Sequence, residues 1–267
     1  MSIISVNLQE GFGNRCSQYA FARAYSEKHG CTLQTNFWMG QKVFQIDDPR
    51  IEKPLPVRRM EDIDRWNGEV DIEVSGWGQH QRCLIYSRAD ARRYFTFRPE
   101  IISMLVNVPK YDIAAHLRWA DFLSIPDAGF IAISKESYLI ACDHFGIDRS
   151  KLRFIQEESP LVVPQIEPGY WISPHSDHHT RSDDPRITSL GFLPDFYALM
   201  QADILFRANS TFSLWAAILG HHSRIFSPNL NGIKKRSGFQ EVPFFEGNHC
   251  AITSDANYHT ELNLRET

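Results

Sequence analysis

The amino-acid sequence predicts an α/β protein with a parallel sheet covered on both faces. From residue 109 onward, short apolar runs alternate with helical patterns, which is the order of strand–helix–strand units. At two places a strand runs through a short turn into a helix: after Ile3–Asn7 and after Ile204–Phe206. The chain has 267 residues, 43% of them apolar and 22% charged, as in ordinary globular proteins.

The first half begins with a strand at Ile3–Asn7 and the loop 10–15. A helix over Ser17–His29 follows from its apolar spacing and ends at Gly30. Residues 40–70 are polar and contain proline, so we expect surface loops there. The remaining expected elements are a strand at Val70–Gly76 and helices at Arg88–Phe97 and Arg98–Val106.

Pro109 comes just before a new strand, and we place a domain boundary near residues 106–111, giving domains 1–108 and 109–267. The terminal segment of the chain is allowed to pack back on the first domain. The expected strands are Ile113–Leu117, Lys151–Ile155, Tyr170–Ser173, Ile204–Phe206 and Arg224–Ser227, and the expected helices are Ser134–Phe145, Leu193–Met200 and Phe212–Leu219. Ligands of such sheets bind at the carboxyl ends of the strands.

The turn after Ile204–Phe206 is the strongest functional signal. Asn209, Ser210 and Thr211 can each cap the helix that follows, and Gly220 is placed to end it. The first amides of a helix have no partner within the helix, so they suit a phosphate group. The turn therefore indicates a nucleotide or a nucleotide-sugar as ligand. A second, weaker signal is the glycine-containing turn Gly11–Asn14, which a tight turn without a ligand also explains.

A third cluster, His116-Leu-Arg-Trp-Ala-Asp-Phe122, directly follows the strand 113–117. It brings His116, Arg118 and Asp121 to a strand end. The planar guanidinium of an arginine donates several hydrogen bonds and stays charged, which suits a diphosphate. The alternative is an ion pair between Arg118 and Asp121 that fixes a loop.

The order of these clusters resembles the bacterial and viral α-1,2-fucosyltransferase family and, more loosely, the wider group of GDP-fucose-dependent fucosyltransferases. Family members open with a pattern like GGLGNQxFQYAxARALA, and this chain has Glu10-Gly-Phe-Gly-Asn-Arg-Cys-Ser-Gln-Tyr-Ala-Phe-Ala-Arg-Ala24. Gly76-Trp-Gly-Gln79 is similar to a GYFQ-type element, and Phe95-Thr-Phe-Arg98 to FTFK. His116–Phe122 is similar to HxRRGDY, and Asn209–Gly220 to NSTFSWWAAWLG.

The resemblance implies a GT-B-like fold of two Rossmann-like domains, with a GDP-sugar donor held mainly by the C-terminal one. It implies inverting transfer, without a metal or another cofactor, to a glycan acceptor. By position, Arg118 would hold the β-phosphate and His116 would line the nucleotide site. Backbone amides of Ser210, Thr211 and Phe212 would bind the diphosphate. From the N-terminal domain, Gly11, Phe12, Gly13 and Asn14 would close over the donor.

Two departures from the family pattern bear on the donor. The second arginine of HxRRGDY is Trp119 here and the glycine is Ala120, so one positive charge is missing. The family also has an SDD-like element that reads guanine, and Glu157 and Glu158 stand in the matching segment. Either glutamate can accept from the guanine N–H groups, and a solvated acidic pair is the alternative. Another nucleotide-sugar donor, or a relative that binds without catalysis, stays open.

A base that takes the proton of the acceptor hydroxyl is not fixed by the sequence. Asp121 and Glu10 are the two candidates, and Glu10 stands where the family has glycine. No DxD-like pair follows a strand; Asp183-Asp184 lies in the polar stretch 174–189. His175, His178 and His179 lie there too, without a spacing that joins them on one face, so we expect a solvated loop and no metal site.

Bulk features exclude other classes. The net charge of −4 does not indicate nucleic-acid binding. No apolar stretch has the length of a membrane span, no signal-peptide pattern opens the chain, and the scattered cysteines suit reduced thiols, so we expect a cytoplasmic protein. Trp77 and Trp215 are expected mostly in the core; Trp77 and Trp38 have facing a sugar as the alternative.

Overall fold

The computed structural model describes residues 2–119, 122, 131–157, 171–173, 190, 192–230, 233, 238–246, 249–251 and 259–261. At 157, 171–173, 249–251 and 259–261 the structure describes only the backbone. The described residues form two compact units, one that ends at Val106 and one that begins at Asn107.

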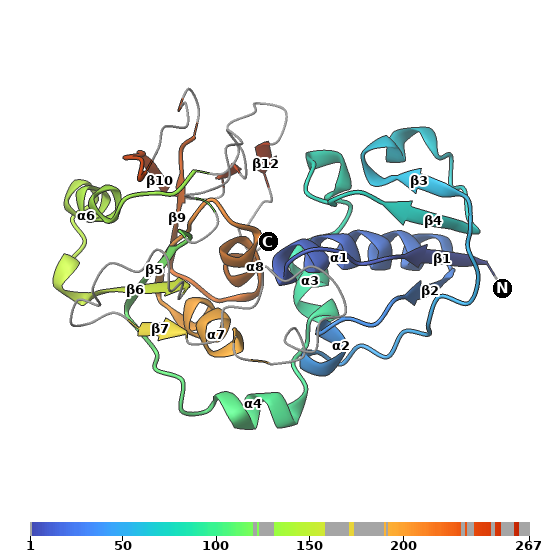
Figure 1. The fold of residues 1–267 in the computed structure, drawn as a ribbon, viewed down its shortest axis with the longest axis horizontal. Coiled ribbons are helices and arrows are strands. Elements are labelled where there is room, and N and C mark those ends of the chain that lie inside the picture. The colour runs from blue at the N-terminus through green and yellow to red at the C-terminus, as the bar shows by residue number, and fades with distance from the viewer. Residues whose placement is uncertain are drawn as a thin grey trace. The chain divides into compact units, whose positions relative to one another are not determined.

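The first unit contains a four-stranded sheet of order β2-β1-β4-β3, in which every neighbouring pair is parallel (Figure 1). Its strands are β1 (Ile3–Val6), β2 (Thr32–Thr35), β3 (Val57–Arg59) and β4 (Ile72–Ser75). Its helices are α1 (Phe12–His29), α2 (Gly40–Val43), α3 (Arg88–Tyr94) and α4 (Pro99–Leu105), with single 3₁₀ turns at Met60–Arg65 and Gln81–Cys83.

Helix α1 begins at Phe12, five residues before the predicted start at Ser17. The reason is burial: Phe12 and Cys16 are buried like Tyr19, so they extend its apolar stripe backwards by one turn at helical spacing. The stretch 40–70, expected as loops, contains β3, α2 and the 3₁₀ turn at Met60–Arg65. Strand β2 was not predicted, because Leu33 is its one large apolar residue.

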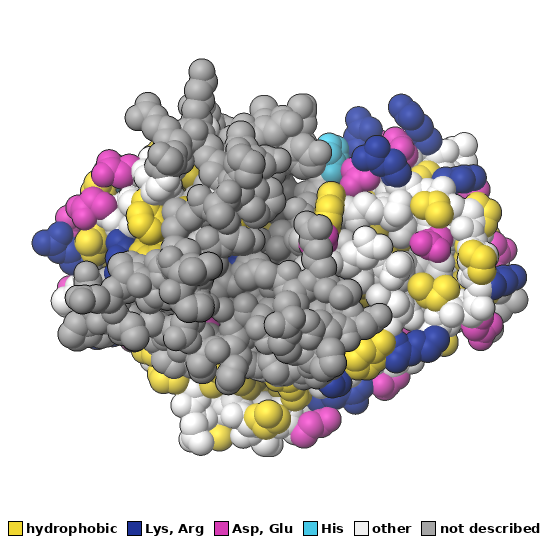
Figure 2. Space-filling model, in the orientation of Figure 1, with side chains coloured by type: hydrophobic (Ala, Val, Ile, Leu, Met, Phe, Trp, Pro, Cys, Tyr) yellow, Lys and Arg dark blue, Asp and Glu magenta, His cyan; other side chains and the backbone are white. Residues whose placement is uncertain are grey.

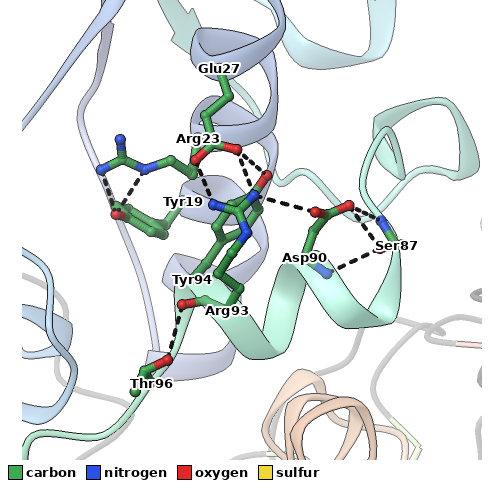
Figure 3. Close-up of polar contacts among 8 residues, drawn as sticks. All are labelled: Tyr19, Arg23, Glu27, Ser87, Asp90, Arg93, Tyr94 and Thr96. Carbon is green, nitrogen blue, oxygen red and sulfur yellow. Dashed lines mark hydrogen bonds and ion pairs between the residues drawn. The ribbon is translucent and has the colours of Figure 1, made fainter.

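Charged side chains hold α3 against α1 (Figure 3). The guanidinium of Arg93 donates to both carboxylate oxygens of Glu27 over 2.9 and 2.7 Å, and the Tyr94 hydroxyl donates to the same carboxylate over 3.1 Å. At the start of α3, Ser87 and Asp90 form a reciprocal capping box. Helix α3 is therefore fixed at both its ends by polar groups.

Strand β3 lies at one edge of this sheet. Val57 is exposed, and Arg58 and Arg59 follow it. The guanidinium of Arg58 donates to both oxygens of the Glu69 carboxylate over 2.8 and 2.7 Å. The open edge of the sheet is thus charged.

The second unit contains a six-stranded sheet of order β10-β9-β8-β5-β6-β7 (Figure 1). The five strands from β9 to β7 run parallel, and β10 pairs antiparallel with β9. The strands are β5 (Ile113–Leu117), β6 (Leu152–Glu157), β7 (Trp171–Ser173), β8 (Ile204–Phe206), β9 (Arg224–Pro228) and β10 (Phe244–Glu246), and β11 (His249–Ala251) and β12 (His259–Glu261) form a separate antiparallel pair.

Helices α6 (Lys135–His144), α7 (Leu193–Gln201) and α8 (Thr211–Leu219) accompany this sheet, with a 3₁₀ turn at Arg149–Lys151. Tyr138 of α6 packs with Phe154, Phe206 and Phe244. On α7 and α8, Phe196 and Phe212 meet with ring centroids 5.2 Å apart. The predicted alternation of strands and helices is confirmed, and β5 and β8 have the predicted bounds.

The tryptophans differ from one another in exposure. Trp38 and Trp215 are buried, whereas Trp77 is 47% exposed, so its assignment to the core was wrong. On the coloured part of the face seen in Figure 2, acidic and basic side chains are intermingled. Within the described part of the chain, no helix combines the length and apolar character needed to cross a membrane.

Candidate active site

The second unit brings five of the predicted residues to one edge of its sheet. Strands β5 and β8 pair directly, with Ala115 opposite Phe206. The last residues of β5 with Arg118, and residues 207–212 after β8, therefore lie next to each other at the carboxyl ends of neighbouring strands. The rings of His116 and Phe212 confirm this proximity, because their centroids are 5.4 Å apart.

His116 is held from two sides. Its side chain is buried against Phe212, and its carbonyl oxygen accepts a hydrogen bond of 2.8 Å from the buried hydroxyl of Tyr138. Burial of that hydroxyl raises the pKa of Tyr138, so it stays protonated and can donate. His116 is therefore a fixed wall of this edge of the sheet.

Arg118 follows His116 and is also buried. Its guanidinium carbon lies 5.0 Å from the ring centroid of Phe122, a cation–π distance. A buried guanidinium at a sheet edge is suited to a planar, anionic ligand. Asp121, the predicted partner or base, lies outside the described residues, as does Ala120.

The turn before α8 is stabilised by its own serines. The Ser210 hydroxyl caps the helix by accepting from the Phe212 amide over 3.2 Å. The Ser213 hydroxyl accepts from the Ala208 amide over 3.2 Å and lies 3.3 Å from the Ala208 carbonyl oxygen. The Phe212 amide, which was expected to meet a diphosphate, is therefore used by the cap, and an anion that takes it must displace the Ser210 hydroxyl.

Arg207 is a residue of this edge that the sequence analysis missed. It is completely buried, and its Nη1 donates to the Ser227 hydroxyl on β9 over 2.9 Å. Arg207 comes directly after Phe206, the last residue of β8, which lies opposite Ala115 of β5. The available signal was an arginine directly after a buried strand, as with Arg118.

Trp119 serves packing. It is buried in the core, and its Nε1 donates to the Ile133 carbonyl oxygen over 2.9 Å. Trp119 thus makes a structural contact at the position where the resembled pattern has an arginine, and Arg207 lies directly after the neighbouring strand β8.

The end of β6 carries a buried amide. Gln156 lies opposite Leu117 of β5, and its Oε1 has no hydrogen-bond partner among the described residues. Glu157 follows as the last residue of β6, opposite Ser173 of β7; its side chain and all of Glu158 lie outside what is described. The predicted guanine-reading segment therefore begins at the same edge as Arg118.

In the first unit, the turn between β1 and α1 is framed by side chains from elsewhere. The Leu8 amide donates to Asn36 Oδ1 over 2.8 Å, and the Gln9 amide donates to Gln18 Oε1 over 2.8 Å. At the other end of the turn, Gln79 Nε2 donates to Asn14 Oδ1 over 2.8 Å. The turn is thus preorganised by the rest of its own unit.

Glu10 stands in this turn with a φ of +67°, a left-handed conformation that costs most non-glycine residues about 1–2 kcal/mol. Its carbonyl oxygen accepts a bond of 2.7 Å from Arg15 Nε. Gly11 is the N-cap of α1 and provides no side-chain cap. Phe12 is buried and Gly13 lies in the first turn of the helix, so the backbone is what Gly11–Gly13 can offer to a ligand.

No group of three or more His, Cys, Asp and Glu side chains that could hold a metal ion occurs among the residues the structure describes. The histidines at 175, 178 and 179 and the aspartates at 183 and 184 fall in the stretch that is not described.

Comparison with known proteins gives a clear result at the level of fold. No family model and no curated protein matches the sequence. Among solved structures, NodZ α-1,6-fucosyltransferase soaked with GDP-fucose matches with a TM-score of 0.56 at 16% identity, over 92% of this chain and 99% of that one. Fucosyltransferase NodZ from Bradyrhizobium matches in another crystal structure with a TM-score of 0.53 at 18% identity, over 85% and 94% of the two chains.

A mutant of FUT1 from Arabidopsis thaliana in complex with GDP matches with a TM-score of 0.52 at 11% identity, over 94% of this chain and 74% of that one. The chain thus has the α/β, GT-B-like fold of these proteins, with a parallel or mostly parallel sheet in each unit.

Proposed function

We propose that this chain is a glycosyltransferase that moves L-fucose, or a related sugar, from a GDP-sugar to a hydroxyl group of a glycan. The reaction would invert the anomeric centre without a metal, and an α-1,2 linkage is the finer form of the proposal. One observation carries it most: a buried arginine, Arg118, and the N-terminus of α8 lie at the carboxyl ends of directly paired strands. Proteins of this fold with GDP or GDP-fucose in their names support it.

Transfer of the sugar builds negative charge on the leaving diphosphate, which nearby positive charge stabilises. The bond between the sugar C1 and the β-phosphate oxygen breaks, and its electron pair stays on the leaving GDP. A bond forms between C1 and the acceptor oxygen, whose proton passes to a base. Arg118 and the amides of the α8 turn are suited to the charge on the leaving group, and loss of one such donor typically costs about 3–4 kcal/mol of barrier.

Arg207 adds a second buried positive charge to the same edge. In a poorly solvated site, a fixed charge acts on a nearby anion more strongly than in water. We propose that it offsets the arginine that Trp119 replaces. His116 would shape the nucleotide site, and the Glu157 carboxylate would accept hydrogen bonds from the N–H groups of guanine.

Glu10 and Asp121 remain the two candidates for the base. The strained backbone of Glu10 favours it, since strain of this kind gathers at functional sites. Gly11, Phe12, Gly13 and Asn14 remain predicted donor contacts through their backbone and the Asn14 amide.

The first test is thermal unfolding with GDP, UDP, CMP and ADP, each with and without Mg²⁺. A ligand at a hundredfold excess over its Kd stabilises the folded state by about 2.7 kcal/mol. We expect a shift with GDP that does not depend on Mg²⁺. A shift with UDP instead, or one that needs the metal, contradicts the proposed donor site.

The second test is turnover. Arg118→Ala should lower transfer from GDP-fucose by about 10²- to 10³-fold while the unfolding temperature without ligand changes little. Near wild-type turnover in this variant would refute the assignment of Arg118.

A different donor is the second candidate function, and the burial of Trp119 in the core favours it, because no charge is available at that position. Turnover of a panel of nucleotide-sugars separates the two. Binding of GDP without turnover of any donor would point to a relative that binds without catalysis.

A further inference from the structure

We propose that Trp77 is a stacking platform for a pyranose ring of the acceptor glycan, at the carboxyl edge of the sheet in the first unit. This inference rests on the proposed function and names a residue of its acceptor site. Trp77 is 47% exposed, whereas Trp38 and Trp66 of the same unit are buried at 1% and 4%. Tryptophan is highly buried on average in folded proteins, so an indole that stays about half exposed departs from that average.

The loop that bears Trp77 is held by the two residues that directly follow it, Gly78 and Gln79. Gly78, directly after it, has a φ of +65°, and a Cβ atom built there would lie 2.8 Å from the carbonyl oxygen of Ser17. The backbone of the loop is thus pressed against α1 at a point where only glycine fits. Directly after Gly78, the side chain of Gln79 donates a hydrogen bond to Asn14 Oδ1 over 2.8 Å. The indole is therefore presented without the entropy cost of ordering a flexible loop.

The loop also lies in the right place. Strand β4 pairs parallel with β1, with Val74 opposite Val6, so the segments that follow the two strands emerge at the same edge of the sheet. One of these segments contains Trp77 and the other contains Glu10, the candidate base. The bond between Gln79 and Asn14 joins them directly. Trp77 is thus two residues from a side chain that contacts the predicted donor turn.

The chemistry of the loop selects the kind of ligand. One face of a pyranose ring exposes C–H groups while its rim carries hydroxyls, so it matches a flat apolar ring with polar neighbours. The neighbours of Trp77 in the loop are Gly76, Gly78, Gln79 and His80, which are polar or without a side chain. A protein partner would need a larger contiguous apolar patch than one indole provides.

The test compares four purified proteins: the wild type, Trp77→Ala, Trp77→Phe and Phe245→Ala. Phe245 is an aromatic residue of similar exposure, 39%, on edge strand β10 of the second unit, and it serves as the matched control. Each protein is labelled and applied, with GDP present, to an array of oligosaccharides that carry terminal galactose, N-acetylglucosamine, glucose or mannose. The oligosaccharide that the wild type binds most tightly is then titrated into each protein to measure its Kd. GDP is titrated separately by calorimetry.

We expect Trp77→Ala to weaken oligosaccharide binding about tenfold or more, and Trp77→Phe and Phe245→Ala to stay within about threefold of the wild type. The Kd for GDP and the unfolding temperature should stay unchanged in all variants. Equal oligosaccharide binding by Trp77→Ala and the wild type overturns the inference, as does a wild type that binds no oligosaccharide. A loss of GDP affinity in Trp77→Ala overturns the inference too, because Trp77 then stacks on the guanine ring of GDP and not on the acceptor.

The proposed function fails separately. If the wild type binds oligosaccharide through Trp77 but does not bind GDP, the platform stands and the donor assignment is wrong.

Discussion

The turns after β1 and β8 connect a strand to a helix at the carboxyl edge of a parallel sheet, yet they are stabilised in opposite ways. The β8 turn is self-contained, since Ser210 and Ser213 bond the backbone of their own segment. The β1 turn depends on distant side chains, among them Asn36 and Gln79, and its helix begins at Gly11 without a side-chain cap.

The two turns therefore offer different groups to a ligand. In the β8 turn, the Phe212 amide is already used, so charge from Arg118 and Arg207 is what a diphosphate gains without displacing the cap. In the β1 turn, no side chain caps the start of α1. Because distant groups hold that turn, we expect changes in those groups to disturb it more than changes elsewhere disturb the β8 turn.

The largest expected effect distinguishes the glycine that ends α8, the helix after the β8 turn, from the glycine that ends α1, the helix after the β1 turn. A Cβ atom on Gly220, after α8, would clash with the Met200 carbonyl oxygen and would lie 2.8 Å from that of Ala216. Gly220→Ala should therefore lower the free energy of unfolding by about 3 kcal/mol, as overpacking does. Gly30 ends α1 in open space with a φ of +64°, so Gly30→Ala should cost about 1 kcal/mol. Urea unfolding checks both, and equal losses would contradict the close packing at Gly220.

The next effect concerns strain in the β1 turn. Glu10→Gly removes a left-handed non-glycine residue and should raise the free energy of unfolding by about 1 kcal/mol. If Glu10 is the base, transfer falls in Glu10→Gly and in Glu10→Gln alike, while Glu10→Gln keeps the wild-type stability. Full activity in Glu10→Gln would leave the residue with a structural role alone.

The cap of the β8 turn gives a smaller effect. Ser210→Ala removes the acceptor of the Phe212 amide and should cost about 1 kcal/mol of stability. The substitution also makes that amide available to an anion. GDP should therefore raise the unfolding temperature of Ser210→Ala by more than it raises that of the wild type. An equal GDP shift in both proteins would argue that the diphosphate does not take this amide.

The smallest effect lies in the polar link between α1 and α3. Hydrogen bonds from Arg93 lower the pKa of Glu27 below its ordinary value of 4.5. The stabilisation is therefore complete above that pH and is lost as the pH falls through the lowered pKa. Arg93→Met should cost below about 1 kcal/mol at pH 7, since the pair is exposed, and the cost should shrink toward pH 3.

Arg224→Met is the matched change in the second unit, where Arg224 donates to both oxygens of Glu246 and lowers the pKa of that carboxyl. Urea titrations at several pH values compare the two. A loss in Arg93→Met that does not depend on pH would assign its effect to packing.

The sequence predicts most of the second unit because its strands are apolar runs with clear ends, such as Ile204–Phe206. It misses β2, whose burial comes from pairing with β1 and not from its own composition. It finds Arg118 and the α8 turn through local pattern. It does not find the burial of Arg207, the left-handed backbone of Glu10 or the exposure of Trp77, because each depends on contacts between segments distant in the sequence.

The edge strand β3 has a consequence for the association of copies. An open strand edge offers unpaired backbone groups on which another chain can add a strand. Here a newcomer would have to strip water from the bidentate pair of Arg58 and Glu69 and lie beside the charge of Arg59. The sheet of the first unit is thereby protected against growth into a continuous intermolecular sheet, even though Val57 leaves an apolar side chain at that edge.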